Sequence, residues 1–418
     1  MFVLKSISAE LFSSAIEEHE LCSYARAARS FDMCARLNPS GPVSLNAYFN
    51  LSSIMQMAGY PDLAVQYLEP VLSNPHMNDE ENDMVLTAHQ FLWALAQDEI
   101  SRDNAIKLYR KLSLLGDLRA DHKLATLVNE GKSALHGNPE YARKVFDQLA
   151  SIFEERLTGQ LGYDVPRMLE QDISKHLDSK YDPDMGKWRI LDIGCGSGLC
   201  GKFFSSYCSF DHLSAPNLSS AASTSTTITS FGEIHGGEVM FEKDLRFLMT
   251  SSDSLLLGVD VSGKMIDICR SSGSYSHAIR CSLQDALLVL SECAASCHGV
   301  ESRFHLVLAA DTFIYVGALS STFKYVHDIL TPHGIFAFSI EEKSEEFIMP
   351  SDKDEAFLQL LDQRGSKLLR TSRYGHNVEY IHELCRVFCF NIESELRINL
   401  RSEFDVSVMG YNFLLRKM

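Results

Sequence analysis

The pattern of apolar and polar positions changes along the chain near residue 188. From about residue 11 to residue 135, apolar residues recur at helical spacing, with almost no strand-like alternation. After residue 188, short apolar runs of strand length alternate with helical stretches. A chain of 418 residues also exceeds what one hydrophobic core usually serves. The pattern therefore predicts an all-α domain followed by an α/β domain.

Similar helical phrases recur in the N-terminal third. The small residues Ala27, Ala64 and Ala105 are 37 and 41 residues apart, near the roughly 34-residue period of helix-turn-helix repeats. In the middle copy, Gly59 and Pro61 interrupt the pattern between two helices. We expect a tetratricopeptide (TPR)-like helical repeat domain over residues 1–138, acting as a scaffold or docking surface; a generic helical bundle is the alternative.

A further helical segment is expected at residues 139–185. It would precede the α/β domain at 186–418 or form a lid over it.

Five strand-like runs follow in order, each leading into a helical stretch. They cover residues 188–193, 255–260, 278–281, 304–310 and 334–340. Two further runs, 404–408 and 412–415, resemble a terminal hairpin that turns at Gly410. Repeated strand-helix units predict a doubly wound, mostly parallel sheet.

A glycine-rich turn follows the first strand. Glycines allow the sharp turn and the close approach of the backbone that a bound nucleotide needs. Gly196, Gly198 and Gly201 also match a dinucleotide fingerprint, but Asp192 ends the strand just before them. Its carboxylate would repel a pyrophosphate and attract the ammonium and sulfonium of S-adenosylmethionine (SAM), by about 4 kcal/mol for unit charges about 4 Å apart at an effective dielectric of about 20. The candidate cofactor-binding residues of this turn are Asp192, Gly194, Cys195, Gly196 and Gly198.

Later strand ends supply the remaining candidates for the cofactor. Asp260 ends the second strand, where a carboxylate can accept hydrogen bonds from two ribose hydroxyls. Val261 and Met265 are placed to pack against adenine. Gln284 and Asp285 follow the third strand, and the carboxylate there can accept from the adenine amino group.

These motifs carry a family resemblance. Residues Ile190–Gly198 with Gly258–Ser262 resemble the class I SAM-dependent methyltransferases, and the likeness covers about residues 186–418. With the repeats, Leu161–Pro166, Ala309–Tyr315 and Arg373–His376, the chain is similar to a group of TPR-containing methyltransferases. The resemblance implies a seven-stranded sheet of the class I type and SAM as cofactor. It also implies that Asp192 and the glycines hold the methionine part, that Asp260 holds the ribose, and that Met265 and Asp285 hold the adenine.

The chain departs from this pattern in two places. Gly198 and Asp260 are 62 residues apart, whereas about 20 residues usually separate such a loop from its ribose acid. We therefore expect a surface insertion at 205–252, which includes the Ser/Thr-rich run 219–230. The family's usual Phe-Asp-x-Tyr-Ala phrase stands here as Phe146–Ala150, without the tyrosine.

Candidates for catalysis are few, because the methyl group of SAM is already activated by the sulfonium charge. His376 and Tyr315 are weak candidates for a general base. Asp311, at the end of the fourth strand, either faces the substrate or caps the following turn. The segment 309–315 is not of the Asn-Pro-Pro-aromatic type used on nucleobase amines.

Composition excludes several partners. The chain has 38 basic and 55 acidic residues, a net charge of −17, and neither part offers the basic surface that long nucleic acid requires. Its 11 cysteines show no zinc-type pairs, so no metal site is expected. No apolar run approaches the roughly 18 residues of a membrane span. The start of the chain lacks a signal or transit pattern, so we expect a cytoplasmic protein.

The sequence thus predicts a SAM-dependent methyltransferase acting on an oxygen or nitrogen nucleophile of a small molecule or of a protein recruited by the TPR-like domain. A catalytically inactive SAM-binding adaptor is the alternative. An NAD(P)-dependent oxidoreductase is disfavoured by Asp192. The sequence does not identify the methyl acceptor, since acceptor pockets are built from loops whose chemistry varies freely.

Overall fold

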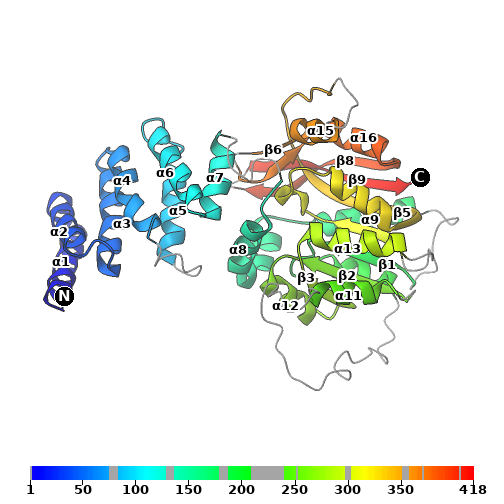
Figure 1. Cartoon of the computed structure of the whole chain (residues 1–418), viewed down its shortest axis with the longest axis horizontal. Coiled ribbons are helices and arrows are strands. Elements are labelled where there is room, and N and C mark those ends of the chain that lie inside the picture. The colour runs from blue at the N-terminus through cyan, green and yellow to red at the C-terminus, as the bar shows by residue number, and fades with distance from the viewer. Residues whose placement is uncertain are drawn as a thin grey trace, which may run out of the picture. The chain divides into compact units, whose positions relative to one another are not determined.

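The computed structural model divides the chain into two compact units, residues 1–134 and residues 135–418 (Figure 1). The residues that the structure describes are 2–74, 83–128, 136–177, 187–208, 240–250, 253–296, 303–350, 357–369, 371–403 and 406–418.

The first unit consists of helices in its described residues, each packed against its neighbour in the chain. They are α1 (Phe2–Glu20), α2 (Tyr24–Leu37), α3 (Pro42–Met57), α4 (Pro61–Leu72), α5 (Asp83–Leu95), α6 (Arg102–Leu114) and α7 (Leu118–Val128).

The three small anchors predicted from the sequence lie in alternate helices of this unit. Ala27 is in α2, Ala64 in α4 and Ala105 in α6, and all three are fully buried. Gly59 has a positive φ of 81° between α3 and α4, and Pro61 is the first residue of α4, as the breaks in the pattern predicted. The unit is therefore all-α and built of successive helix pairs. Its membership of the TPR class stays a prediction.

The second unit is built on one sheet with the strand order β3-β2-β1-β4-β5-β7-β6, and β9 pairs with both β5 and β8. Strands β1 to β5 run parallel to one another, whereas β9 is antiparallel to β5 and to β8. The strands are β1 (Arg189–Ile193), β2 (Leu255–Asp260), β3 (His277–Arg280), β4 (Phe304–Ala309), β5 (Leu330–Glu342), β6 (Ser366–Leu368), β7 (Tyr374–His376), β8 (Phe390–Glu403) and β9 (Val406–Lys417).

Helices cover both faces of this sheet. They are α8 (Pro139–Leu149), α9 (Val165–His176), α10 (Gly201–Phe204), α11 (Met240–Leu248), α12 (Gly263–Ser271), α13 (Leu283–Ser296), α14 (Ser320–Ile329), α15 (Phe357–Gly365) and α16 (Val378–Val387). This mixed α/β architecture with a mostly parallel sheet is the predicted fold class.

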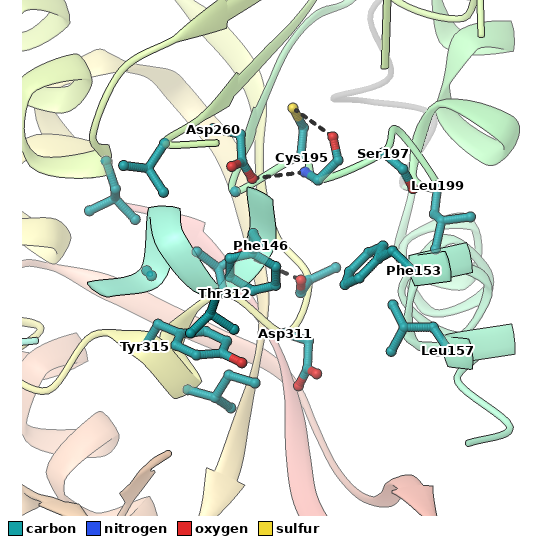
Figure 2. A pocket seen from close by; sticks show the side chains of 18 of the residues that line it. Phe146, Phe153, Leu157, Cys195, Ser197, Leu199, Asp260, Asp311, Thr312 and Tyr315 are labelled. Atoms are coloured by element: carbon teal, nitrogen blue, oxygen red, sulfur yellow. Dashed lines mark hydrogen bonds between the residues drawn. The ribbon is translucent and has the colours of Figure 1, made fainter. Parts of the chain in front are cut away.

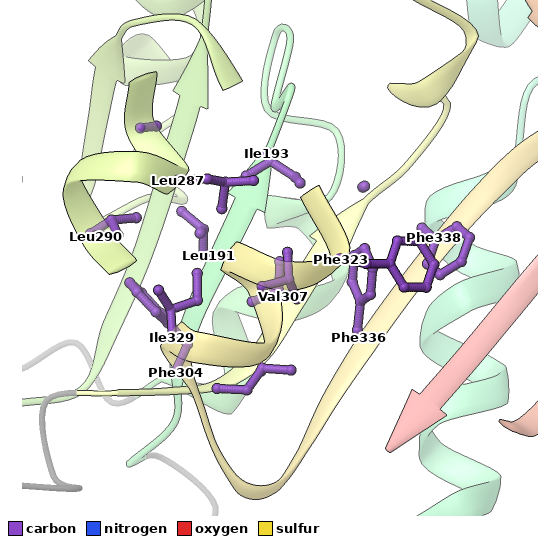
Figure 3. Close-up of a cluster of buried hydrophobic side chains, with 14 of the residues drawn as sticks. Leu191, Ile193, Leu287, Leu290, Phe304, Val307, Phe323, Ile329, Phe336 and Phe338 are labelled. Atoms are coloured by element: carbon purple, nitrogen blue, oxygen red, sulfur yellow. The ribbon is translucent and has the colours of Figure 1, made fainter. Parts of the chain in front are cut away.

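The alternation of side chains along the strands produces two cores. Leu191 and Ile193 of β1 point to the face covered by α11, α13, α14 and α16, where Phe323, Phe336 and Phe338 also pack (Figure 3). Ile190 points to the opposite face, which α9 and α10 cover. Burial on both faces explains why the central strands read as continuous apolar runs.

Two sequence predictions about the sheet are wrong in detail. The sheet has nine strands among the described residues rather than seven, because β6 and β7 are three-residue strands too short to show alternation. The terminal hairpin is formed by β8 and β9, and Gly410 lies inside β9 rather than at a turn. A Cβ at Gly410 would lie 2.2 Å from the Ile340 carbonyl oxygen, so the glycine permits close strand packing.

Parts of the predicted surface insertion at 205–252 are buried in the structure. Tyr207 and Cys208 are buried, and Leu245 of α11 belongs to the main core. The Ser/Thr-rich run 219–230 lies outside the described residues.

No helix in the described ranges is long and apolar enough to cross a membrane. Among the same residues, no group of three or more His, Cys, Asp or Glu side chains could hold a metal ion.

Candidate functional site

A cavity of about 610 Å³ opens in the second unit, at the carboxyl ends of β1, β2 and β4. Its polar side carries the glycine loop, Asp260 and Asp311. Its apolar side comes from α8 and the segment after it, including Phe146, Phe153 and Leu157 (Figure 2). Sites of open parallel sheets lie at such strand ends, and a cavity of this volume suits a nucleotide-sized ligand.

The glycine loop after β1 has a backbone conformation that favours glycine, and backbone hydrogen bonds hold it in place. Gly194, Gly196 and Gly198 all have positive φ angles, of 72°, 53° and 94°. The N–H groups of Gly194 and Cys195 donate to the Val259 carbonyl oxygen at 2.8 and 3.1 Å. A Cβ at Gly194 would lie 2.5 Å from the Thr312 hydroxyl oxygen. The loop is thereby held between the ends of β2 and β4.

Ser197, within the same loop, has an unsatisfied polar atom at the cavity. The residue is 2% exposed, and its hydroxyl oxygen has no hydrogen-bond partner among the described residues. It also lines the cavity. Because buried hydroxyls are normally paired, this atom indicates where a polar ligand group would bind. The sequence reasoning placed the glycines around it in the site and omitted Ser197 itself.

Asp260, at the end of β2, has both carboxylate oxygens fixed by backbone N–H groups. Gly196 donates to Oδ2 at 3.0 Å and Ser262 donates to Oδ1 at 2.8 Å. Burial raises the pKa of Asp260 to about 6, although both N–H groups lower it. A carboxylate has about four acceptor sites, so a cavity-facing Asp260 keeps the capacity to accept two hydroxyl groups.

Asp192, the last acid of β1, lies beneath the loop and is not among the residues that line the cavity. It is 1% exposed, and the Tyr275 hydroxyl donates to its Oδ2 at 2.6 Å. Burial raises the pKa of Asp192 to about 6, and the Tyr275 hydrogen bond opposes this effect. The Asp192 carboxylate therefore does not face the cavity directly.

Helix α8 is tied to the loop that follows β2. Asp147 Oδ1 accepts from the Ser262 hydroxyl at 2.6 Å, and Arg143 pairs with Asp147 Oδ2 at 3.0 Å. Phe146, the residue before Asp147, packs edge-on against Tyr315 with ring centroids 4.9 Å apart. These contacts hold the apolar side of the cavity in place.

At the other end of the cavity, Asp311 is held in an uncommon backbone conformation. Its φ is 55°, and its N–H donates to the Ser339 hydroxyl at 2.8 Å. Arg401 is 1% exposed and donates to both Asp311 carboxylate oxygens at 3.3 Å and to Glu341 at 2.5 Å. The sequence reasoning identified neither Arg401 nor Glu341, because only the pairing of the hairpin with β5 brings them to Asp311.

The structure brings some of the sequence-predicted residues together at the cavity and separates others from it. Those that line the cavity are Gly194, Cys195, Gly196, Asp260, Val261, Gln284 and Tyr315. Those outside its lining are Asp192, Gly198, Met265, Asp285 and His376.

Two of the separated residues have helix-capping contacts instead. Met265 is fully buried, and its N–H donates to Ser262, the N-cap of α12, at 3.1 Å. Asp285 Oδ2 accepts from the Ser282 hydroxyl at 2.6 Å, and the Asp285 N–H donates back to that hydroxyl oxygen at 3.1 Å. This is a reciprocal cap at the start of α13.

His376 is not positioned as a base. The ring is fully buried on β7, and its Nε2 lies 2.9 Å from the Gly317 carbonyl oxygen. Burial lowers the pKa of His376 to about 4. Of the two weak candidates, Tyr315 alone lines the cavity.

No protein-family profile matches the chain, and a search of curated proteins finds no match. Solved structures do match it. An S-adenosylmethionine-dependent methyltransferase from Mesorhizobium loti is 17% identical, with a TM-score of 0.33 over 60% of this chain and 98% of that one. The 1,6-didemethyltoxoflavin-N1-methyltransferase of Burkholderia thailandensis is 15% identical, with a TM-score of 0.37 over 67% and 89%. The [4+2]-cyclase SpnF is 13% identical, with a TM-score of 0.39 over 68% and 98%. Identities and scores this low indicate neither the activity nor the substrate of this chain.

Proposed function

We propose that the second unit binds SAM in this cavity and transfers its methyl group to an oxygen or nitrogen nucleophile. The observation that carries the proposal is the arrangement of Asp260 beside the glycine loop. The Asp260 carboxylate is buried, faces the cavity and is oriented by the N–H groups of Gly196 and Ser262. A ribose with two free hydroxyls fits the acceptor sites that remain.

The glycine loop favours a cationic amino-acid group over a pyrophosphate. In dinucleotide sites the pyrophosphate rests on the N-terminus of a helix, whose dipole favours negative charge. Here the loop leads into α10, which has four residues, and the buried Asp192 lies in β1 just before the loop. A buried carboxylate and a very short helix together favour the ammonium and sulfonium of SAM. The orphaned Ser197 hydroxyl gives a further polar contact for the methionine part.

When bound, SAM supplies an activated methyl group. The chain then has to align an acceptor in line with the carbon–sulfur bond and to exclude water. Phe146, Phe153 and Leu157 suit that role, because they line the apolar side of the cavity (Figure 2).

The acceptor belongs either to a small molecule or to a protein recruited by the N-terminal helical unit. The helix pairs of that unit and the buried alanines Ala27, Ala64 and Ala105 agree with a TPR-like docking function.

Transfer of a tritium-labelled methyl group from SAM into a cell extract tests the proposal. The wild-type protein and the surface control Asp267→Asn should label an acceptor in either the small-molecule or the protein fraction. Asp260→Asn should label much less, because it weakens the ribose contact. Binding of SAM without labelled product in any fraction would instead support the inactive adaptor.

A further inference from the structure

Asp311 has three features that the proposed methyl transfer does not by itself explain. It is a non-glycine residue with a φ of 55°, a conformation uncommon outside glycine, asparagine and aspartate. It lines the cavity. Its carboxylate is held by Arg401, a guanidinium that is itself 1% exposed. Backbone conformations of this kind persist where the surrounding structure holds them, and they cluster at functional sites.

Several contacts hold the turn that contains Asp311. The Asp311 N–H donates to Ser339 on β5, and the Thr312 hydroxyl donates to the Ile193 carbonyl oxygen of β1 at 2.8 Å. Arg401 reaches the carboxylate from β8 and donates at the same time to Glu341 on β5. Contacts from three strands, β1, β5 and β8, thus fix the turn and the orientation of its carboxylate.

The sheet order places Asp311 on the acceptor side of the cavity. Strand β1 lies between β2, which ends at Asp260, and β4, which ends just before Asp311. In a ligand that contacts Asp260 with its ribose and the β1 loop with its amino-acid part, the sulfur lies near the end of β1. Asp311, after β4, is then on the side of β1 away from the ribose. Figure 2 shows Asp260 at one end of the cavity and Asp311 with Tyr315 at the other.

The surroundings of Asp311 suit a nitrogen nucleophile. Arg401 contacts both carboxylate oxygens, and the aromatic rings of Phe146 and Tyr315 line the same cavity as Asp311. Aromatic faces and a carboxylate together recognise amines and their cations. A carboxylate is too weak a base to ionise an alcohol, but it accepts a hydrogen bond from the N–H of a neutral amine.

We propose that Asp311 is a catalytic residue that binds the acceptor through an amine N–H and so holds the nitrogen in line with the carbon–sulfur bond. This inference rests on the proposed function and narrows its acceptor to an amine. In the step, the amine lone pair forms the nitrogen–carbon bond while the carbon–sulfur bond breaks, and its electron pair stays on sulfur. One proton then passes from the methylated nitrogen to solvent.

Sinefungin is a suitable chemical probe, because it carries an amine-bearing carbon in place of the methylsulfonium of SAM. Its amine projects toward the acceptor side, whereas S-adenosylhomocysteine (SAH) has no group there. Calorimetry would measure the affinities of both compounds for the wild-type protein, Asp311→Asn, Asp311→Gly and the surface control Asp267→Asn at pH 7.5. Asparagine keeps the shape of the side chain, and glycine accepts the positive φ without strain.

We expect both Asp311 variants to bind SAH like the wild type and to bind sinefungin about tenfold more weakly, the loss of one charge-assisted hydrogen bond. The control should bind both compounds unchanged. Unchanged sinefungin affinity in both variants, with SAH still bound, overturns the role of Asp311 and leaves SAM binding intact. Failure of the wild type to bind either compound overturns the proposed function itself.

Discussion

The Asp147 carboxylate and the Ser262 hydroxyl form a hydrogen bond of 2.6 Å that joins α8 to the N-terminus of α12. The same Ser262 oxygen caps α12 by accepting from the Met265 N–H, and the Ser262 N–H donates to Asp260. One serine therefore links the apolar side of the cavity to the acid proposed to bind ribose.

Ser262→Ala should destabilise the protein and weaken SAH binding together. The variant removes a helix cap and a buried hydrogen bond, worth about 1–2 kcal/mol of unfolding free energy. Urea unfolding and calorimetry measure the two effects. Ser271→Ala, at an exposed hydroxyl of the same helix, is the matched control and should change neither. A variant as stable as the wild type would show that this contact does not stabilise the fold.

Gly194→Ala should abolish SAH binding, because its Cβ would overlap the short, branched Thr312 side chain at 2.5 Å. Gly273→Ala is the matched control. Gly273 has a similar φ of 67°, but no atom lies within 4 Å of its added Cβ. Both variants carry the backbone strain of roughly 1 kcal/mol, and only Gly194→Ala adds the clash. Equal effects of the two on binding would mean that the contact with Thr312 is unimportant.

The affinity for SAH should rise as the pH increases from 5 to 7. The pKa of Asp260 is about 6, so the carboxylate that accepts the ribose hydroxyls is fully ionised only above that pH. In Asp260→Asn this part of the pH dependence should disappear. Calorimetry at several pH values measures it, and an affinity that falls over the same range would contradict the role of Asp260.

Asp192 should make the ligand-free protein less stable at neutral pH. Its pKa is raised to about 6 in the folded state, so folding favours the protonated carboxyl. The contribution of Asp192 to the unfolding free energy is therefore present below about pH 4 and is lost as the pH rises through 6. The loss is at most about 3 kcal/mol. Urea unfolding should show a smaller decrease between pH 4.5 and 7 for Asp192→Asn than for the wild type. A decrease of equal size in the two proteins would mean that the Asp192 carboxylate carries no such cost.

The parts of the site that could be predicted from the sequence are those built within one strand-turn unit. Gly194, Gly196 and Asp260 directly follow or end buried apolar runs, so local pattern alone places them at the strand ends. The chemistry of a turn is determined by its own residues, and in the structure all three line the cavity.

The parts that could not be predicted depend on contacts between distant segments. Arg401 reaches Asp311 only because β9 pairs with both β5 and β8, and no local pattern indicates that register. Met265 and Asp285 have the right spacing for adenine contacts, but the same spacing serves a buried core position and a helix cap. His376 was a candidate because its ring can titrate near neutral pH. In the structure the ring is buried on β7 and does not line the cavity.

Calorimetric titration of the wild-type protein with SAH and, separately, with NAD at pH 7.5 tests most directly whether this cavity is a SAM site. We expect one molecule of SAH to bind per chain, with the affinity reduced at least about tenfold in Asp260→Asn by the loss of charge-assisted hydrogen bonds. NAD should give no binding heat. Binding of NAD without binding of SAH would contradict the account.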